Sequence, residues 1–296
     1  MLWNSGFEIS TSKAANTING DKINATIYYT LSNSRAFLHE ETTSKEDKEI
    51  FMTQLAYSDH CYGGYQTLQA STLWSSLQTL RDVNYIVSLW FLTLDKQGCH
   101  ELIKAGADGV MQAMILSLGA LSFSNNHLEF NMRPKDLHRN YLFRRINYGI
   151  GTHVNISVVV GEDNKAVLYA ALDQNDKEYY ACDGGCLDPP VQLGKHYSKF
   201  PVKKTDPPTA VLYITSDKEH MMLLKHALHV KEVMEAPAHE HHVIALHKHG
   251  HHWGGLPPFF WISILTLVLI FHLFLVKLIY NEYCVSPERF PSRYNI

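Results

Sequence analysis

The sequence predicts an α+β fold: a helical segment, then an antiparallel β-sandwich, then one C-terminal transmembrane helix. Three observations lead to this prediction. Apolar residues recur at intervals of three and four in the first third of the chain, apolar and polar residues alternate beyond residue 119, and one long uncharged apolar run lies near the C-terminus. The 296 residues, 46% of them apolar, are enough to bury a sizeable core.

Residues 1–119 form the predicted helical segment, with helices expected at 43–57, 65–81, 84–94 and 108–119. The last of these interleaves small residues with large apolar ones, which is typical of a buried helix packed closely against its neighbours. Asp108 stands where a side chain can cap the helix N-terminus, and Gly119 stands where helices commonly end.

Residues 120–215 form the predicted β-sandwich. Turn-forming clusters such as Ser124-Asn125-Asn126 and Glu162-Asp163-Asn164 separate short segments with period-two alternation. This spacing is typical of an antiparallel sandwich. Strands are expected at 120–123, 127–130, 141–148, 153–160, 166–172, 178–182 and 209–215.

A further helix is predicted at 216–236. The Ser216 hydroxyl can cap it, with Glu219 three residues on completing a capping box, and Pro237 should end it. Residues 237–258 then read as a histidine-rich juxtamembrane linker.

The apolar run at 259–280 is the predicted transmembrane helix. Residues 259–276 carry no formal charge, and extension past Lys277 gives the about 20 residues that cross a hydrocarbon core. Aromatic residues at both ends fit the two membrane interfaces. Arg289 and Arg293 favour a cytosolic tail at 281–296, so we expect a single-pass protein of the endoplasmic reticulum or Golgi membrane with its N-terminal domain in the lumen.

Two glycosylation sequons, at Asn24 and Asn155, agree with a luminal domain. In the strand predicted at 153–160, Asn155 shares the polar face with His153 and Ser157. The net charge of −3 and pI near 6.6 exclude the basic footprint typical of nucleic-acid binding.

Four cysteines precede the apolar run, and an even number in an oxidising compartment predicts two disulfides among Cys61, Cys99, Cys182 and Cys186. A bridge between Cys182 and Cys186 fits a tight turn across Asp183-Gly184-Gly185 and leaves Cys61 for Cys99, although four cysteines permit three connectivities. Cys284 follows the apolar run and would be a reduced juxtamembrane thiol, a candidate for palmitoylation.

The N-terminus conflicts with a luminal domain, because Met1-Leu2-Trp3-Asn4 begins no signal peptide. Taken literally, the chain would be a tail-anchored protein facing the cytosol. An incomplete N-terminus is the interpretation we prefer.

A histidine cluster precedes the apolar run and includes His247, His249, His251 and His252. Neutral imidazoles bind zinc or copper and titrate near pH 6. Gly250, Gly254 and Gly255 indicate a mobile segment, which favours a solvated linker over a dedicated metal site, and no cofactor is expected.

Asp59-His60-Cys61 favours a disulfide over an activated thiol, because adjacent side chains rarely point together.

Nearly the whole chain resembles the C-terminal half of an uncharacterised animal family of type I single-pass membrane proteins, a KIAA-series family with a domain of unknown function. The resemblance implies a further N-terminal half with a hydrophobic leader, and hence a luminal domain, but no activity. It is carried by Asp59-His60-Cys61, Ala105-Gly106-Ala107, Ser117-Leu118-Gly119-Ala120-Leu121, Asn126-His127-Leu128, Tyr180-Ala181-Cys182, Gly185-Cys186-Leu187-Asp188, Phe271-His272-Leu273-Phe274-Leu275 and Lys277-Leu278-Ile279-Tyr280-Asn281-Glu282-Tyr283-Cys284.

A second resemblance is to glycoside hydrolases of the maltose and trehalose phosphorylase kind, in which an α/α toroid leads into a β-sandwich. It implies that the helical segment is a partial, toroid-like remnant. Between Tyr57 and Asp108 there is too little chain for the toroid segment that supplies the general acid, so no catalytic residue is carried over. The motifs, in family order, are Asp108-Gly109, Gln112-Ala113, Leu118-Gly119-Ala120-Leu121, Leu128-Glu129-Phe130 and Arg133-Pro134.

The function predicted from these features is protein or glycan interaction by a luminal, glycosidase-like domain without catalysis. The expected partners are the lipid bilayer and a luminal or membrane protein, or a glycan. Three alternatives stay open: a carbohydrate-active enzyme, a histidine-rich metal or pH sensor, and a cytosolic tail-anchored adaptor.

Overall fold

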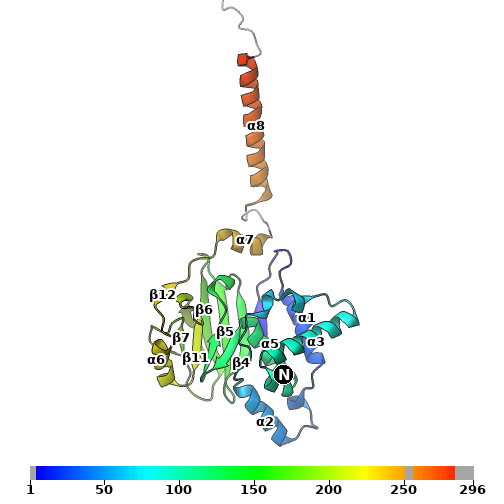
Figure 1. The fold of residues 1–296 in the computed structure, drawn as a ribbon, viewed down its shortest axis with the longest axis vertical. Helices are drawn as coiled ribbons and strands as arrows, with labels where there is room; N and C mark the ends of the chain where they lie inside the picture. The colour runs from blue at the N-terminus through cyan, green and yellow to red at the C-terminus, as the bar shows by residue number, and fades with distance from the viewer. Residues whose placement is uncertain (1–4, 251–255, 284–296) are drawn as a thin grey trace, which may run out of the picture.

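Two five-stranded antiparallel sheets and a group of helices make up the protein, as the sequence predicts. The computed structural model describes residues 5–250 and 256–283. Figure 1 shows the helices of residues 1–119 gathered on one side of the strands, with the last helix projecting away from the rest of the molecule.

The first sheet has the strand order β1-β4-β5-β6-β9. Its central strand alternates as predicted, because Val154, Ile156 and Val158 are buried while the residues between them are not. The first and last strands of this sheet were not predicted from the sequence. The strand bounds are β1 Gly6–Ile9, β4 Tyr141–Asn147, β5 His153–Val160, β6 Ala166–Gln174 and β9 Ser198–Pro201.

The second sheet has the order β2-β3-β11-β7-β8, and a separate antiparallel pair joins β10 to β12. Aromatic rings connect the two large sheets: Phe130 of β3 lies 5.5 Å from Phe143 of β4, measured between ring centroids. The bounds are β2 Leu121–Ser124, β3 His127–Phe130, β7 Tyr180–Asp183, β8 Val191–Gln192, β10 Lys203–Asp206, β11 Leu212–Thr215 and β12 Glu232–Glu235.

Five α-helices lie between β1 and β2, of which α1 and α4 were not predicted. Helix α3 is longer than expected because Thr79 and Asp82 form a capping box that starts it before the apolar repeat. The bounds are α1 Gly20–Ser32, α2 Lys45–Ala56, α3 Leu80–Lys96, α4 His100–Lys104 and α5 Ala107–Gly119.

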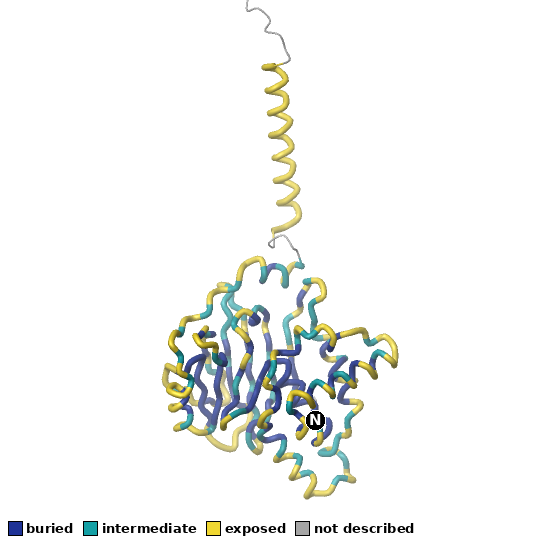
Figure 2. The backbone as a smooth tube through the Cα atoms, in the orientation of Figure 1, coloured by how far each residue is buried: buried dark blue, intermediate teal, exposed yellow. Residues whose placement is uncertain are grey.

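Helix α5 links the helices to the sandwich. All its residues except Asp108 are buried, and it packs on β4 and β2 within one hydrophobic core that includes residues of both parts. Gly119 leaves room for the ring of Phe143, while Ala120, rather than a glycine, takes the left-handed conformation that ends the helix. Figure 2 shows the buried backbone concentrated in this helix and the strands beside it.

The prediction of a helix at 65–81 is wrong. The chain forms two short 3₁₀ turns, Thr67–Gln69 and Ser71–Trp74, instead. The Trp74 indole donates to the Thr67 carbonyl at 2.9 Å, and the Thr67 hydroxyl bonds that of Ser117 on α5 at 3.1 Å. These buried tertiary bonds hold the backbone against α5 and override the local helical pattern.

The helix predicted at 216–236 is shorter, and the linker predicted at 237–258 contains a helix. Helix α6, Lys218–Ala227, is capped by Asp217 instead of Ser216, and it is followed by His229 in the left-handed conformation. The chain then pairs as β12 with β10. Helix α7, His241–His249, is held on the domain by the buried side chains of Ile244 and Ala245.

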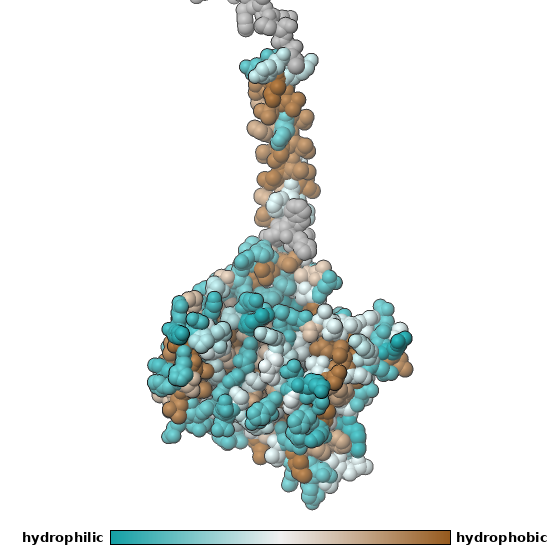
Figure 3. Space-filling model, in the orientation of Figure 1, coloured by the Kyte–Doolittle hydropathy of each residue, from teal (hydrophilic) through white to brown (hydrophobic). Residues whose placement is uncertain are grey.

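Helix α8, Pro258–Tyr283, is the element predicted to cross a membrane. It is the one helix of the described residues that is long and apolar enough to do so. None of its residues is buried, and Figure 3 shows an apolar surface along most of its length on the face in view.

Candidate functional site

A pocket of 460 Å³ lies where the helices meet the first sheet. Junctions of this kind are common sites of ligand binding, especially where a few polar groups converge on an apolar wall. The apolar wall comprises Leu38, Met52, Leu55, Met111 and Ile150, and the polar side chains are Ser5, His39, Lys48, Asp108, Gln112, Arg145, Asn147, His153 and Gln174.

Asp108 lines this pocket and has one oxygen without a hydrogen-bond partner among the described residues. Its Oδ1 lies 3.2 Å from His39 Nε2, whereas its Oδ2 is buried and has no hydrogen-bond partner among the described residues. The predicted capping role is wrong, because Gly106 is the N-cap and Asp108 lies in the first turn of α5. A buried carboxylate oxygen without a partner is costly to the fold, and the exposed part of the same carboxylate faces the pocket as a hydrogen-bond acceptor.

Arg145 reaches the pocket from a β-bulge in β4. The register between β4 and β5 shifts between Phe143 and Ile146, and Arg145 has a φ of 54°, which a residue with a side chain rarely adopts. The Asn155 side-chain oxygen supports the bulge by accepting from the Arg145 backbone N–H at 2.8 Å. Strained backbone of this kind is concentrated at functional sites.

Asp173 pairs with the two basic side chains on this side of the pocket. Its oxygens lie 3.1 Å from Arg145 Nε and 3.5 Å from His153 Nδ1. Burial, with the neighbouring Arg145 charge, lowers the pKa of His153 despite the carboxylate. His153 is therefore neutral at pH 7 and retains both a donor and an acceptor nitrogen.

Gln112 connects the two sides of the pocket. Its buried amide bonds both backbone groups of Asn147, accepting from the N–H at 3.3 Å and donating to the carbonyl at 3.4 Å. Because Gln112 lies one turn after Asp108 on α5, this contact sets the position of the carboxylate relative to the end of β4.

The pocket combines one carboxylate with several N–H donors. Asp108 is the only carboxylate among the described residues that line it, while Lys48, Arg145 and the two histidines offer N–H groups. This set suits a small molecule with both hydroxyl donors and oxygen acceptors. Among the described residues, the pocket lining carries one carboxylate, whereas most glycoside hydrolases use a pair.

The two sequon asparagines lie in different environments. Asn24 is exposed on α1, whereas Asn155 is half-buried in the middle of β5, on the polar face as predicted. Neither lines the pocket. The support that Asn155 gives to the Arg145 bulge is a structural role that the sequon did not predict.

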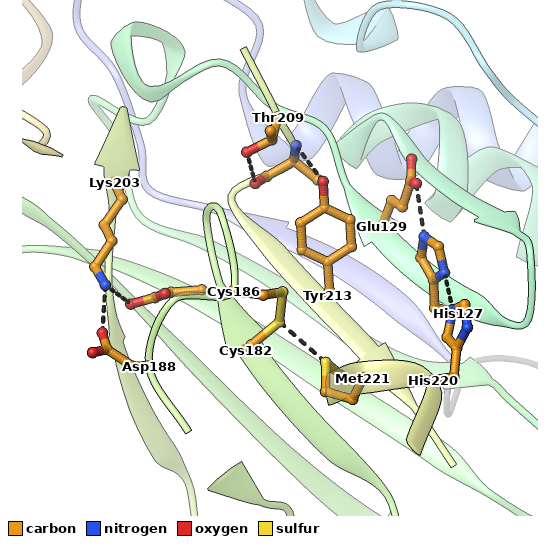
Figure 4. The surroundings of a disulfide bond; sticks show 12 residues. His127, Glu129, Cys182, Cys186, Asp188, Lys203, Thr209, Tyr213, His220 and Met221 are labelled. Carbon is orange, nitrogen blue, oxygen red and sulfur yellow. Dashed lines mark hydrogen bonds and ion pairs between the residues drawn. A yellow bond between two sulfur atoms is a disulfide. The ribbon is translucent and has the colours of Figure 1, made fainter. Parts of the chain in front are cut away.

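The structure pairs Cys61 with Cys99 and Cys182 with Cys186, with Cα separations of 4.4 Å and 5.1 Å. This is the connectivity that the turn argument favours. Figure 4 shows the second bridge beside Met221 of α6, whose sulfur lies 3.1 Å from that of Cys182. Cys284 lies outside the described residues.

A chain of hydrogen bonds near this disulfide runs from Glu129 through His127 to His220. His127 is buried, with Nε2 2.8 Å from Glu129 Oε1 and Nδ1 2.9 Å from His220 Nε2 (Figure 4). Burial alone would raise the pKa of Glu129, but its hydrogen bonds with His127 and Asn131 hold the pKa below its ordinary value. The chain ties α6 to β3.

The candidate metal ligands do not converge within the described residues. His247 bonds the Ser12 hydroxyl through Nδ1 at 2.8 Å, His249 is exposed at the end of α7, and His251 and His252 lie outside the described range. No group of three or more metal-binding side chains forms within residues 5–250 and 256–283. His247 instead lies against His138, 4.6 Å away between ring centroids.

Sequence reasoning did not identify His39, Arg145 or His153 as site residues. Arg145 offered no local signal, because the bulge that exposes it depends on its pairing with β5. Trp74 and Trp90 are buried in the core, where they pack edge to face, 5.3 Å apart, away from the pocket.

Comparison with known proteins gives relatives but no known activity. The chain is 42% identical over 288 residues to the uncharacterized protein KIAA2013 homolog of Xenopus tropicalis and 41% identical over 285 residues to that of Xenopus laevis. These alignments cover 96% and 95% of the chain but 46% of each relative, so the chain spans about half the length of these curated relatives. No solved structure matches.

A family model supports the same assignment. It matches residues 1–293 and is described as an uncharacterized conserved protein family, DUF2152. The family description carries no membrane topology and no glycoside hydrolase activity. The match nonetheless extends over almost the whole chain, and the chain therefore belongs to the DUF2152 family of conserved proteins.

Proposed function

We propose that the protein is a membrane-tethered binding protein of the secretory pathway that holds a polar, hydroxyl-bearing ligand in the pocket between its helices and its sandwich. The observation that carries this proposal is the Asp108 side chain, which lines the pocket, is partly exposed and has an oxygen, Oδ2, without a partner among the described residues. A ligand hydroxyl would donate to the exposed part of this carboxylate. A glycan is the ligand class we favour, since it offers several hydroxyl groups within the reach of one pocket.

Binding without cleavage is the activity that fits the lining residues. An inverting glycosidase needs an acid and a base on opposite sides of the scissile bond, and a retaining enzyme needs an acid and a nucleophile. Asp108 is the only carboxylate lining the described pocket. A carbohydrate-active enzyme is the alternative, and it predicts that ligand is consumed.

The membrane tether is supported by the length and exposure of α8. Its 26 residues extend for about 39 Å, which exceeds the about 30 Å of a hydrocarbon core. A helix of this composition with no buried residue would expose a large apolar surface to water, and a bilayer would cover it.

A luminal position for the domain is supported by its two disulfides and by the sequons at Asn24 and Asn155. In this orientation residues after α8 face the cytosol, where Cys284 would be available for palmitoylation. A cytosolic adaptor would instead keep its cysteines reduced and its sequons unmodified.

The binding proposal can be tested with the full chain in lipid nanodiscs. We would screen a panel of soluble oligosaccharides by saturation-transfer NMR and compare wild type with Asp108→Asn and Glu41→Gln. Glu41 is exposed and does not line the pocket, so it is the matched control. We expect a signal from at least one oligosaccharide that Asp108→Asn weakens about tenfold and Glu41→Gln leaves unchanged, because one hydrogen bond to a charged group contributes about 1.5–3 kcal/mol.

Two results would contradict the proposal. Equal binding by wild type and Asp108→Asn would remove the pocket as the site. New reducing ends in the oligosaccharide sample would show turnover and favour the enzyme alternative.

A further inference from the structure

Within residues 259–276 of α8, three polar side chains interrupt the apolar surface: Ser263, Thr266 and His272. Figure 3 shows a hydrophilic spot about midway along this helix. The two hydroxyls donate to carbonyl groups of their own helix, Ser263 to Phe259 and Thr266 to Ile262, each at 2.8 Å. Their hydrogens are therefore satisfied without another helix.

His272 cannot satisfy both of its ring nitrogens in this way. Its Nδ1 lies 2.8 Å from the Val268 carbonyl oxygen. Because a carbonyl can only accept, Nδ1 carries the hydrogen and Nε2 of the neutral ring presents a lone pair. This Nε2 has no partner within the described part of the chain.

The position of His272 makes the unpaired nitrogen costly. At about 1.5 Å per residue it lies about 21 Å from the Pro258 end of α8 and about 17 Å from the Tyr283 end, well inside a hydrocarbon core of about 30 Å. No water is present at that depth to donate to Nε2. Polar residues inside a membrane generally face another helix or a polar cavity.

We propose that α8 pairs within the membrane with a transmembrane helix of another protein, which donates a hydrogen bond to His272 Nε2 from a serine, threonine, tyrosine, asparagine or glutamine side chain. The inference rests on the membrane tether proposed above. Val268 and Val276, one turn before and after His272, complete the contact face and allow a closer approach than Ile270 and Phe274 on the opposite face.

A second copy of α8 does not supply the hydrogen-bond donor that His272 Nε2 requires. Parallel helices of the same protein would bring His272 to His272, and each would present an accepting Nε2 while its Nδ1 hydrogen remains bonded to Val268. Neither copy supplies the donor. The partner is therefore a different helix.

Site-specific photocrosslinking in the full chain, expressed in animal cells, tests the pairing. Benzoylphenylalanine would replace Val276 on the proposed face or Phe274 on the opposite face. We expect an adduct from position 276 that His272→Leu reduces about fivefold or more and His272→Gln, which retains an acceptor, preserves. Mass spectrometry of the adduct should identify a transmembrane segment with a donor side chain at the matching depth, and substitution of that donor should abolish the adduct.

Each other outcome overturns the inference in a recognisable way. An adduct containing only this chain would show pairing with a second copy. Equal adducts from positions 274 and 276, or adducts unaffected by His272→Leu, would show that His272 does not direct the contact. Alkaline carbonate extraction separates the two proposals: protein that stays in the membrane but gives no adduct contradicts the pairing alone, whereas extracted protein contradicts the membrane tether itself.

Discussion

At the scale of single residues, Asp108 destabilises the fold, and we propose that it binds the ligand. Its hydrogen bond with His39 is partly exposed and contributes at most about 1 kcal/mol, while the buried Oδ2 lacks a partner. Residues that bind ligands are often not the residues that would make the empty protein most stable.

Asp108→Asn should therefore leave the free energy of unfolding within about 1 kcal/mol of wild type, or increase it, because an amide costs less to bury than a carboxylate. Denaturant unfolding of the full chain in detergent would measure this. A loss of several kcal/mol would show that Asp108 serves the fold and would weaken its assignment to ligand binding.

The two disulfides should contribute unequally to stability. Cys61 and Cys99 are 38 residues apart, whereas Cys182 and Cys186 are 4 apart, and closure of the longer loop removes more entropy from the unfolded chain. Replacing the first pair with serine should cost about 4 kcal/mol and replacing the second about 2 kcal/mol. Thermal unfolding of both double variants would rank them, and the reverse order would contradict the loop-length argument.

At the scale of elements, the contact between α4 and α5 depends on a glycine. A methyl group on Gly109 would overlap the backbone carbonyl oxygen of Leu102, which cannot move without shifting α4. This contact places the first turn of α5, and hence Asp108, against the pocket.

Gly109→Ala should destabilise the protein by about 1–3 kcal/mol, even though alanine is the better helix former. Gly63→Ala is the matched control, since a methyl group there meets no atom within 4 Å. Chemical denaturation of both variants would compare them. Equal stability would mean that α4 and α5 can separate at little cost.

The attachment of α7 to the domain should weaken in acid. Burial, with His138 and Arg139 nearby, lowers the pKa of His247 to about 4. Because this pKa lies below the ordinary value of 6.5, attachment of the helix favours the neutral imidazole of His247. The resulting contribution to the stability of the attached state is complete above pH 6.5 and is lost as the pH falls toward 4. Burial also lowers the pKa values of His138 and His239, with the same sign.

Hydrogen exchange of residues 241–249 at pH 7.5, 6 and 5, corrected for intrinsic rates, should show protection decreasing with pH. His247→Gln should reduce this dependence, because glutamine can still bond the Ser12 hydroxyl but does not titrate. His249→Gln, on the exposed end of the same helix, should behave as wild type. Identical profiles for all three proteins would exclude His247 as the titrating group.

At the scale of the whole molecule, the orientation across the membrane can be determined by glycosylation. Asn155 is better left unchanged in such a test, because its side chain supports the Arg145 bulge. Ser157→Ala removes that sequon without altering Asn155, and Asn24→Gln removes the other at an exposed position.

We expect the wild type, expressed in animal cells behind a signal peptide, to shift in gel mobility on glycosidase treatment, and the double variant Asn24→Gln and Ser157→Ala to show no shift. Single variants would show which site is used. If wild type does not shift, protease protection in intact vesicles distinguishes a luminal domain with unused sequons from a cytosolic domain. Digestion of the domain would place it in the cytosol.

Local sequence patterns predicted the elements whose own residues carry a clear apolar signal. Helix α5, strand β5 and helix α8 have a clear apolar period or an unbroken apolar run, so each can be recognised without knowledge of its neighbours. Strands β1, β9 and β12 were missed because each is four residues long and exists through its pairing with a distant strand.

The sequence by itself determined the α+β class, the alternation of the sandwich strands and the position of the apolar helix, because each depends on the spacing of apolar residues along the chain. Only the tertiary structure decided the turns at 67–74, the attachment of α7 and the pocket. Asp108, Arg145 and His153 come together because Gln112 fixes α5 to β4 and Asn155 supports the bulge. These contacts join segments that are distant in the chain, and no local pattern encodes them.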